Sequence, residues 1–238
     1  MVNKNHQKLL AILKKNVGDC ENREWVKRYL GTTKEYLGIK TGIRQKLVKD
    51  LVKKEVSGTD DYRDLLLSLA LGDSFDEMAS VGTMLIEFPK WRKQLEPEIL
   101  DKLLERVEGW AETDSICQSS YSPVELLGNW TVWERLLGGF NHDKNIHKRR
   151  ASLVLLTKPS RTSNDTRLAK IAFANIEKLK REKEILITKA ISWLLRSLIK
   201  HHPKEVAEYL TKNEGVLPKV VIREVRNKLT TGKKSGKK

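Results

Sequence analysis

The sequence predicts an all-α protein built from packed helices. Apolar residues recur with helical spacing along nearly all of the 238 residues, whereas the alternating runs typical of strands are scarce. Roughly a dozen helices of about 10–18 residues with short connections fit this pattern. Helix pairs of about 40 residues that stack on their neighbours are typical of an α-solenoid with HEAT-like (ARM-like) repeats. Because internal sequence similarity is weak, a compact irregular α bundle is the alternative.

Local start and stop signals place the helices of the N-terminal half. Ser74, followed by two acidic residues, is typical of a helix start, and Phe88-Pro89 ends that helix. Thr41 is expected to cap a helix that runs through Val52. The other expected helices are one around 9–13, one that carries Trp25 and Tyr29 before Gly31, one between Asp60 and Gly72, one that starts at Pro97, and one around Trp110.

The C-terminal half is expected to contain six helices. Ser122-Pro123 is a good start for the first, and Gly138-Gly139 is expected to end it. Asn141 or Asp143 is expected to cap the second, and Pro159 to close it. The six expected ranges are 123–137, 144–157, 167–180, 184–200, 203–212 and 220–229.

The chain is strongly basic, with 46 Lys+Arg against 31 Asp+Glu and a formal net charge of +15. We expect one domain over residues 1–230 and a disordered basic tail over 231–238, since the tail is low in complexity and rich in lysine. The tail holds only four of the lysines, so the body is basic in its own right. Nucleic acid is therefore the first partner to consider, and a soluble protein with lysine-rich faces is an equally good interpretation of the charge.

Several classes of protein are excluded by what the sequence lacks. Cys20 and Cys117 lie far apart, which gives no disulfide framework and indicates a reducing, cytoplasmic compartment. The N-terminus lacks the apolar run of a signal peptide, and no apolar stretch approaches the ~18 residues of a membrane span. The histidines have no partner at zinc-site spacing, and there is no Gly-rich phosphate loop. We therefore expect no metal and no cofactor.

Trp110 and Asp114 are the first candidate site residues. In a helix they are i and i+4, so an indole and a carboxylate share one face, about one turn apart. A lone acid beside an aromatic ring in a basic chain needs an explanation. The simpler interpretation is that Trp110 belongs to the core and that Asp114 caps a helix leading into Ile116.

Two further residues break the pattern of their helices. In the 184–200 helix, Trp193 falls off the apolar stripe and shares the polar face with Lys189 and Arg196, which suits a phosphate-binding face or packing against the next helix pair. In the 144–157 helix, Arg150 stands at an inward-facing position. A buried guanidinium must be paired, so Arg150 either forms a structural ion pair with a glutamate or faces a ligand-binding cleft.

In combination these motifs resemble a known family. Trp110-x3-Asp114-Ser115, then Arg149-Arg150-Ala151-Ser152, then Lys189-Ala190-Ile191-Ser192-Trp193-Leu194-Leu195-Arg196 occur in an order and at spacings similar to those of the DNA alkylation repair family, the AlkD-like DNA glycosylases. Tyr36-Leu37-Gly38-Ile39-Lys40 and the basic segment after it are similar to the N-terminal part of that family. The resemblance spans most of 25–230. One departure is that Gly109 and Ala111 flank Trp110 where relatives often carry bulkier or polar residues.

The resemblance implies an α-solenoid whose concave basic surface cradles double-stranded DNA. The implied activity is excision of cationic alkylated purines, such as 3-methyladenine and 7-methylguanine, without extrusion of the base. By position, Asp114 matches the catalytic carboxylate, Trp110 and Trp193 match the two aromatic residues at the lesion, and Arg150 matches the cleft arginine. The residues expected to bind DNA are Trp110, Trp193, Arg150, Arg149, Lys189 and Arg196.

Two other functions are compatible with the sequence. The first is a non-catalytic HEAT-like protein that binds distorted or branched DNA through the same basic face. The second is a protein–protein scaffold whose basic surface binds an acidic partner. We expect a monomer, associated with the nucleoid.

Overall fold

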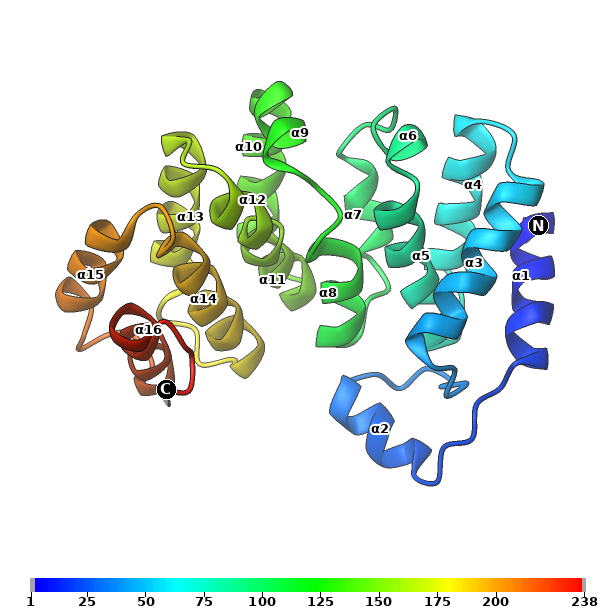
Figure 1. The fold of residues 1–238 in the computed structure, drawn as a ribbon, viewed down its shortest axis with the longest axis horizontal. Coiled ribbons are helices and arrows are strands. Elements are labelled where there is room, and N and C mark those ends of the chain that lie inside the picture. The colour runs from blue at the N-terminus through cyan, green and yellow to red at the C-terminus, as the bar shows by residue number, and fades with distance from the viewer. Residues whose placement is uncertain (1–2, 237–238) are drawn as a thin grey trace. The chain divides into compact units, whose positions relative to one another are not determined.

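The structure, a computed structural model, describes residues 3–236 and is all-helical over that range (Figure 1). Glu35 and Ser74 form an isolated bridge, and no strand is present among the described residues. The contacts divide the chain into two compact units, Met1–Ser120 (unit 1) and Tyr121–Lys238 (unit 2). No helix among residues 3–236 is both long enough and apolar enough to span a bilayer.

Unit 1 packs its helices in two rows. α3 packs against α5 and α5 against α8, while α1 and α7 pack against α4 (Figure 1). α2 lies outside these rows and packs against α8. The helices are α1 (Lys4–Lys15), α2 (Arg23–Leu30), α3 (Thr41–Glu55), α4 (Thr59–Ala70), α5 (Phe75–Glu87), α6 (Pro89–Arg92), α7 (Ile99–Leu103) and α8 (Trp110–Cys117).

Unit 2 repeats one helix pair. α10 packs against α11, α13 against α14, and α15 against α16, and the second helices of the three pairs, α11, α14 and α16, pack in series. The helices are α9 (Pro123–Gly128), α10 (Trp130–Asn141), α11 (Ile146–Val154), α12 (Thr157–Thr162), α13 (Thr166–Leu179), α14 (Ile185–Leu198), α15 (Pro203–Lys212) and α16 (Lys219–Thr231). The expected all-α fold of HEAT-like helix pairs is confirmed.

Several expected boundaries are wrong, for local reasons. The helix expected from Pro123 is interrupted at Asn129, whose backbone is not helical, and is therefore divided into α9 and α10. Gly138 and Gly139 do not end α10, because the buried residues around them keep the helix packed. Pro159 does not close the 144–157 helix. That helix ends at Val154, and Pro159 lies in the first turn of α12, where proline needs no N–H partner.

Two expected caps are also displaced. α11 is capped by the side chain of Asn145, which accepts from the backbone N–H of His147, and neither Asn141 nor Asp143 caps it. Thr41 is the first residue of α3, after the N-cap Lys40. The start at Ser74 is confirmed, since Ser74 and Glu77 form a reciprocal capping box at α5.

Glu77 also ties α5 to α1, which gives unit 1 a dependence on pH. His6 Nε2 lies 2.6 Å from Glu77 Oε1, and both side chains are buried. Burial raises the pKa of Glu77, but the hydrogen bonds from His6 and Ser74 outweigh this effect and hold the pKa below its ordinary value of 4.5.

Acidification is therefore expected to remove the contribution of Glu77 to stability. Because the pKa of Glu77 is lower in the folded state, its contribution is complete above the unfolded value and is lost as the pH falls through the folded value. Thermal unfolding of the wild type and of Glu77→Gln between about pH 6 and about pH 3 checks this. The difference in stability should shrink on acidification, and a difference that stays constant would contradict the assignment.

The C-terminal segment folds back against α16. Thr231 is the last residue of that helix, and Gly232 follows it with a φ of 74°. Lys234 Nζ lies 3.2 Å from a carboxylate oxygen of Glu224, and the Asn227 amide donates to the Lys234 carbonyl. The tail expected over 231–238 therefore includes Lys234, which makes these contacts. Its last two residues, Lys237 and Lys238, lie outside the described residues.

Candidate functional site

The N-terminus of α8 places Trp110 and Asp114. Gly109 is the N-cap, and a Cβ on it would lie 2.2 Å from the Leu30 carbonyl oxygen, so only glycine allows the two backbones to approach this closely. Trp110 is the first residue of the helix, and Asp114 follows one turn later. Asp114 therefore stands within the helix, so its interpretation as an N-cap is wrong. Both side chains are half-buried.

A buried ion pair fixes this end of α8. Glu112 is fully buried, and Lys34 Nζ donates to its carboxylate at 3.0 Å. The Thr32 hydroxyl donates to the other oxygen of Glu112 at 2.8 Å, and the backbone N–H of Glu108 donates at 2.9 Å to the oxygen that Lys34 contacts. Lys34 also donates to the Arg106 carbonyl at 2.7 Å. Together these bonds attach the 32–34 loop to the start of α8, one turn from Asp114.

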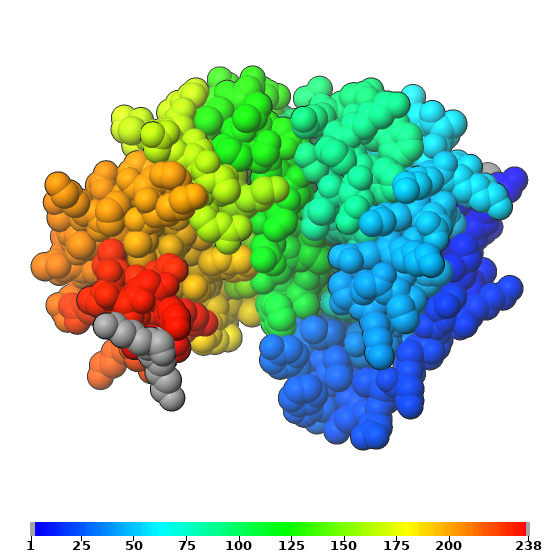
Figure 2. All heavy atoms as spheres, in the orientation of Figure 1, coloured from blue at the N-terminus to red at the C-terminus, as the bar shows by residue number. Residues whose placement is uncertain are grey.

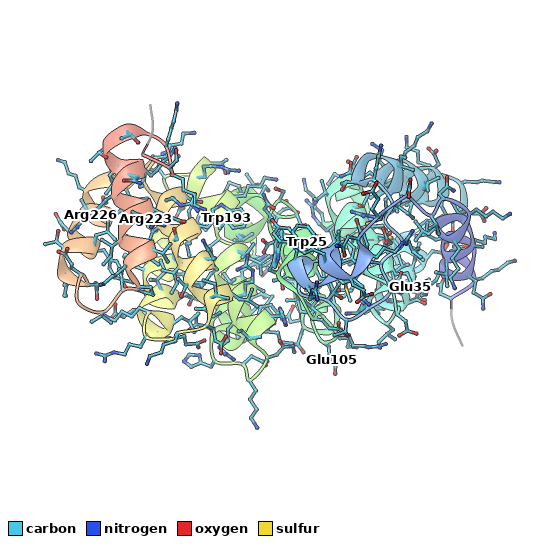
Figure 3. The ribbon with its side chains drawn as sticks, turned by 90° about the horizontal axis from the view of Figure 1, so that it is seen from below. Trp25, Glu35, Glu105, Trp193, Arg223 and Arg226 are labelled. Carbon is cyan, nitrogen blue, oxygen red and sulfur yellow. The ribbon has the colours of Figure 1, made fainter. Side chains whose placement is uncertain are left out.

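Three aromatic rings form a continuous surface beside α8. The Trp110 indole N–H donates to the Tyr29 carbonyl at 2.6 Å, and the two rings meet edge to face with centroids 5.5 Å apart. Trp25 stacks on Tyr29 with an interplanar angle of 2°. Trp25 and Tyr29 are 54% and 59% exposed, and α2, which carries them, has no buried residue. Figure 2 shows α2 as a lobe of its own on unit 1, and Figure 3 labels Trp25.

Trp25 and Tyr29 are i and i+4 in the sequence and therefore share one face of α2, a face to which the sequence alone gave no role. The signal that could have found this surface was an aromatic pair at i and i+4 in a short segment in which four of eight residues are charged. Exposed, stacked rings of this kind suit contact with nucleobases or sugars.

Asp114 faces a pocket in unit 1. The pocket has a volume of about 270 Å³ and is lined by residues of α3, α5, α8 and the turn after α8. Arg44, Thr83 and Asp114 are among the lining residues, which places a guanidinium and a carboxylate at the same hollow. Arg44 pairs with the buried Asp76, with 3.3 Å between Nη1 and Oδ1. Burial raises the pKa of Asp76, an effect that Arg44 opposes.

In unit 2, the two arginines of α11 are held by internal partners. Arg150 is 4% exposed, as its inward position predicted, and its Nη1 donates to the Leu186 carbonyl at 2.5 Å. Arg149 forms a bidentate pair with Glu182 at 2.9 and 3.2 Å. Nη1 of Arg149 also donates to the carbonyls of Asp143 and Lys144. Most of the hydrogen-bonding capacity of Arg149 is thus used within unit 2.

On α14, the cations beside Trp193 surround one buried acid of α16. Glu224 is 5% exposed and accepts from the Ser192 hydroxyl at 2.6 Å. Lys189 and Arg196 approach the same carboxylate at 3.7 and 4.0 Å. Burial raises the pKa of Glu224, but the hydrogen bonds from Ser192 and Lys234 outweigh it and lower the pKa. Burial lowers the pKa of Arg196, and the negative charge of Glu224 opposes this effect.

Trp193 lies half-buried within this basic face. Figure 3 shows it on α14, with Arg223 and Arg226 on the neighbouring α16. Lys189, one turn before Trp193 on α14, is exposed. Unit 2 therefore presents an indole and several cations on two adjacent helices, which is the composition expected of a phosphate-binding face.

Comparison with protein families decides where the chain belongs. The model of the family described as "DNA alkylation repair enzyme" matches residues 12–229. The chain belongs to the DNA alkylation repair enzyme family. A solved structure described as a predicted DNA alkylation repair enzyme from Enterococcus faecalis is similar, with a TM-score of 0.68 and 18% identity over 90% of this chain and 99% of that one. At this identity the likeness establishes the fold. No curated protein sequence matches significantly.

The match to the DNA alkylation repair enzyme family covers all of the candidate site residues. The structure brings Trp110 and Asp114 together in unit 1, and Lys189, Trp193 and Arg196 together in unit 2. That the Trp110 and Asp114 pair and the Trp193 group line one and the same basic surface stays a prediction. Among residues 3–236, no cluster of three or more His, Cys, Asp or Glu side chains is arranged to hold a metal ion.

Proposed function

We propose that this chain is a DNA glycosylase that hydrolyses the N-glycosidic bond of cationic alkylated purines in duplex DNA, as a monomer and without base flipping. Its substrates are 3-methyladenine and 7-methylguanine. The observation that carries the proposal is the placement of Asp114, a half-buried carboxylate that faces a pocket one turn from Trp110, in a member of a DNA repair family.

The chemistry needs only one acid. Alkylation at N3 or N7 makes the purine cationic and therefore a good leaving group, which departs neutral without protonation. As the bond breaks, positive charge develops on the deoxyribose. A carboxylate beside C1′ stabilises that charge and orients the attacking water or accepts its proton. We assign both tasks to Asp114.

The aromatic rings and cations would bind the DNA. The faces of Trp110 and Trp193 suit a cationic nucleotide, at about 0.5–2 kcal/mol for each cation–π contact. Lys189 and Arg196 supply phosphate contacts beside Trp193. Arg150, held at the Leu186 carbonyl, is assigned to the same strand-anchoring surface, whereas Arg149 chiefly braces α11 against Glu182.

Lys189→Ala is expected to weaken DNA binding by a similar factor for every sequence and to reduce the salt dependence. Loss of one phosphate contact lowers the slope of log K against log salt by about 1. Fluorescence anisotropy at several salt concentrations measures both quantities. Lys178→Ala, which removes an exposed lysine on the first helix of the same pair, is the matched control and should behave as wild type. An unchanged slope for Lys189→Ala would remove Lys189 from the interface.

The proposed function is tested by release of free base. Purified protein is incubated with methylated duplex DNA, and 3-methyladenine and 7-methylguanine are measured in the supernatant. Time-dependent release supports the glycosylase. Salt-sensitive DNA binding without release would support the non-catalytic alternative, and absence of DNA binding would support a scaffold with an acidic protein partner.

A further inference from the structure

A buried acid lies beneath the basic face of unit 2. Glu224 of α16 is 5% exposed, and it lines a hollow of about 450 Å³ on the surface of this unit. Burial raises the pKa of its carboxyl, but hydrogen bonds from Ser192 and Lys234 hold that pKa below the ordinary value of 4.5, so Glu224 is ionised at neutral pH. A fixed negative charge at this position repels phosphate and attracts the cations of α14. A phosphate-binding face on α14 and α16 therefore needs a cation that compensates Glu224.

Lys234 is the cation closest to this acid among residues 3–236. It stands in the C-terminal segment, residues 232–236, which turns back along α16 (Figure 1). Lys234 Nζ lies 3.2 Å from Oε1 of Glu224, within hydrogen-bond distance. Lys189 Nζ lies 3.7 Å from the same oxygen, and Arg196 Nε lies 4.0 Å from the other oxygen. Both α14 cations are too distant to hydrogen-bond to Glu224, and the side chain of Lys189 is 47% exposed, so its ammonium group is available to an acceptor outside the protein.

The C-terminal segment is held by contacts that do not depend on the side chain of Lys234. Gly232 takes a φ of 74°, which turns the chain back, and the side chain of Lys228 donates to the Gly232 carbonyl. The Asn227 amide donates to the Lys234 carbonyl at 3.2 Å. A Cβ on Gly236 would lie 2.9 Å from the Asn227 side chain, so the segment packs closely on α16. Replacing Lys234 by alanine should therefore leave the course of the chain unchanged.

We propose that Lys234 is a positioning residue of the DNA-binding face: it compensates the charge of Glu224 and thereby leaves Lys189 free to bind a DNA phosphate. The inference rests on the proposed function and adds the C-terminal segment to the part of unit 2 that binds DNA. Lys234 acts through Glu224 and does not itself contact the phosphate. When Lys234 is absent, Glu224 draws Lys189 into a hydrogen bond, and the face loses a phosphate contact.

The salt dependence of DNA binding tests this assignment. Lys234→Ala is expected to lower the slope of log K against log salt by about 1, the same change as is expected for Lys189→Ala. The double substitution should also lower the slope by about 1, because both changes remove the same phosphate contact. Glu224→Gln keeps an acceptor for the Ser192 hydroxyl but carries no charge, so its addition to Lys234→Ala should restore the wild-type slope. Fluorescence anisotropy with duplex DNA measures all of these variants.

Lys233→Ala is the matched control. It removes the same charge from the same segment, but Lys233 is exposed and is not among the cations around Glu224, so the slope should stay that of the wild type. The inference would be overturned by a slope lowered by about 2 in the Lys189 and Lys234 double variant, by an equal loss in Lys233→Ala, or by no recovery with Glu224→Gln. Each of these results would mean that Lys234 contributes only its own charge.

A measurement without DNA separates this inference from the proposed function. NMR titration of the Glu224 carboxyl should give a higher pKa in Lys234→Ala than in the wild type, since a cation and a hydrogen-bond donor are lost. An equal pKa in the two proteins would overturn the inference. A wild-type protein that binds DNA but releases no base would overturn the glycosylase and leave this inference standing, whereas a protein that binds no DNA would overturn both.

Discussion

Asp114→Asn is expected to lower the single-turnover release of 7-methylguanine by about 100-fold or more while DNA binding is retained. The amide has nearly the same size and shape as the carboxylate but lacks its charge, so it can neither stabilise the sugar cation nor accept the proton of water. Because Asp114 is half-buried on α8 and does not cap that helix, the substitution should leave the fold unchanged.

Three measurements make this prediction specific. Release of base is followed under single-turnover conditions, affinity by anisotropy, and folding by thermal unfolding. Glu105→Gln, which removes an exposed acid of unit 1 outside the pocket, is the matched control and should keep wild-type release. If Asp114→Asn released base at the wild-type rate, Asp114 would have no part in the chemistry.

Glu112→Ala is expected to have the largest effect on stability, a loss of about 3–5 kcal/mol. The substitution leaves Lys34 buried without its carboxylate partner and removes the acceptor for Thr32 and for the Glu108 backbone. Since these bonds attach the 32–34 loop to α8, the position of Trp110 should change as well. Urea unfolding measures the free energy of unfolding, and the part of the fluorescence change that is lost when Trp110 is also replaced by Phe reports on Trp110.

A double substitution tests whether the unpaired charge is the cause. Lys34→Met combined with Glu112→Leu replaces both charges with apolar groups and should recover much of the lost stability, because no buried charge remains. Glu108→Ala, at a more exposed acid of the same cluster, should cost much less. If Glu112→Ala cost under about 1 kcal/mol, the pair would not be the main support of α8.

The fold was predictable wherever the signals were local. The Ser74 capping box and the 203–212 helix follow from a few neighbouring residues, and the inward position of Arg150 follows from helical periodicity alone. The helix break at Asn129 and the short helix around Pro159 were not predictable, because the choice between ending and restarting a helix depends on how the flanking segments pack.

The candidate site was only partly predictable, because its supports are distant in sequence. Lys34 and Glu112 are separated by 78 positions, and neither stands in a pattern that identifies the other. One partner of Arg150 is the backbone carbonyl of Leu186, which any residue type could supply. The i, i+4 spacing of Trp110 and Asp114 was visible, whereas the pocket that Asp114 faces is formed by three helices.

The close approach of Gly109 to the Leu30 carbonyl has a mechanical consequence. Two backbones in direct contact, joined by the Trp110–Tyr29 hydrogen bond, have little freedom to slide, so α2 follows any displacement of α8. A label attached to α2 at the exposed position of Trp25 should therefore report, as a change in distance to the rest of unit 1, any ligand-induced shift of the helix that carries Asp114.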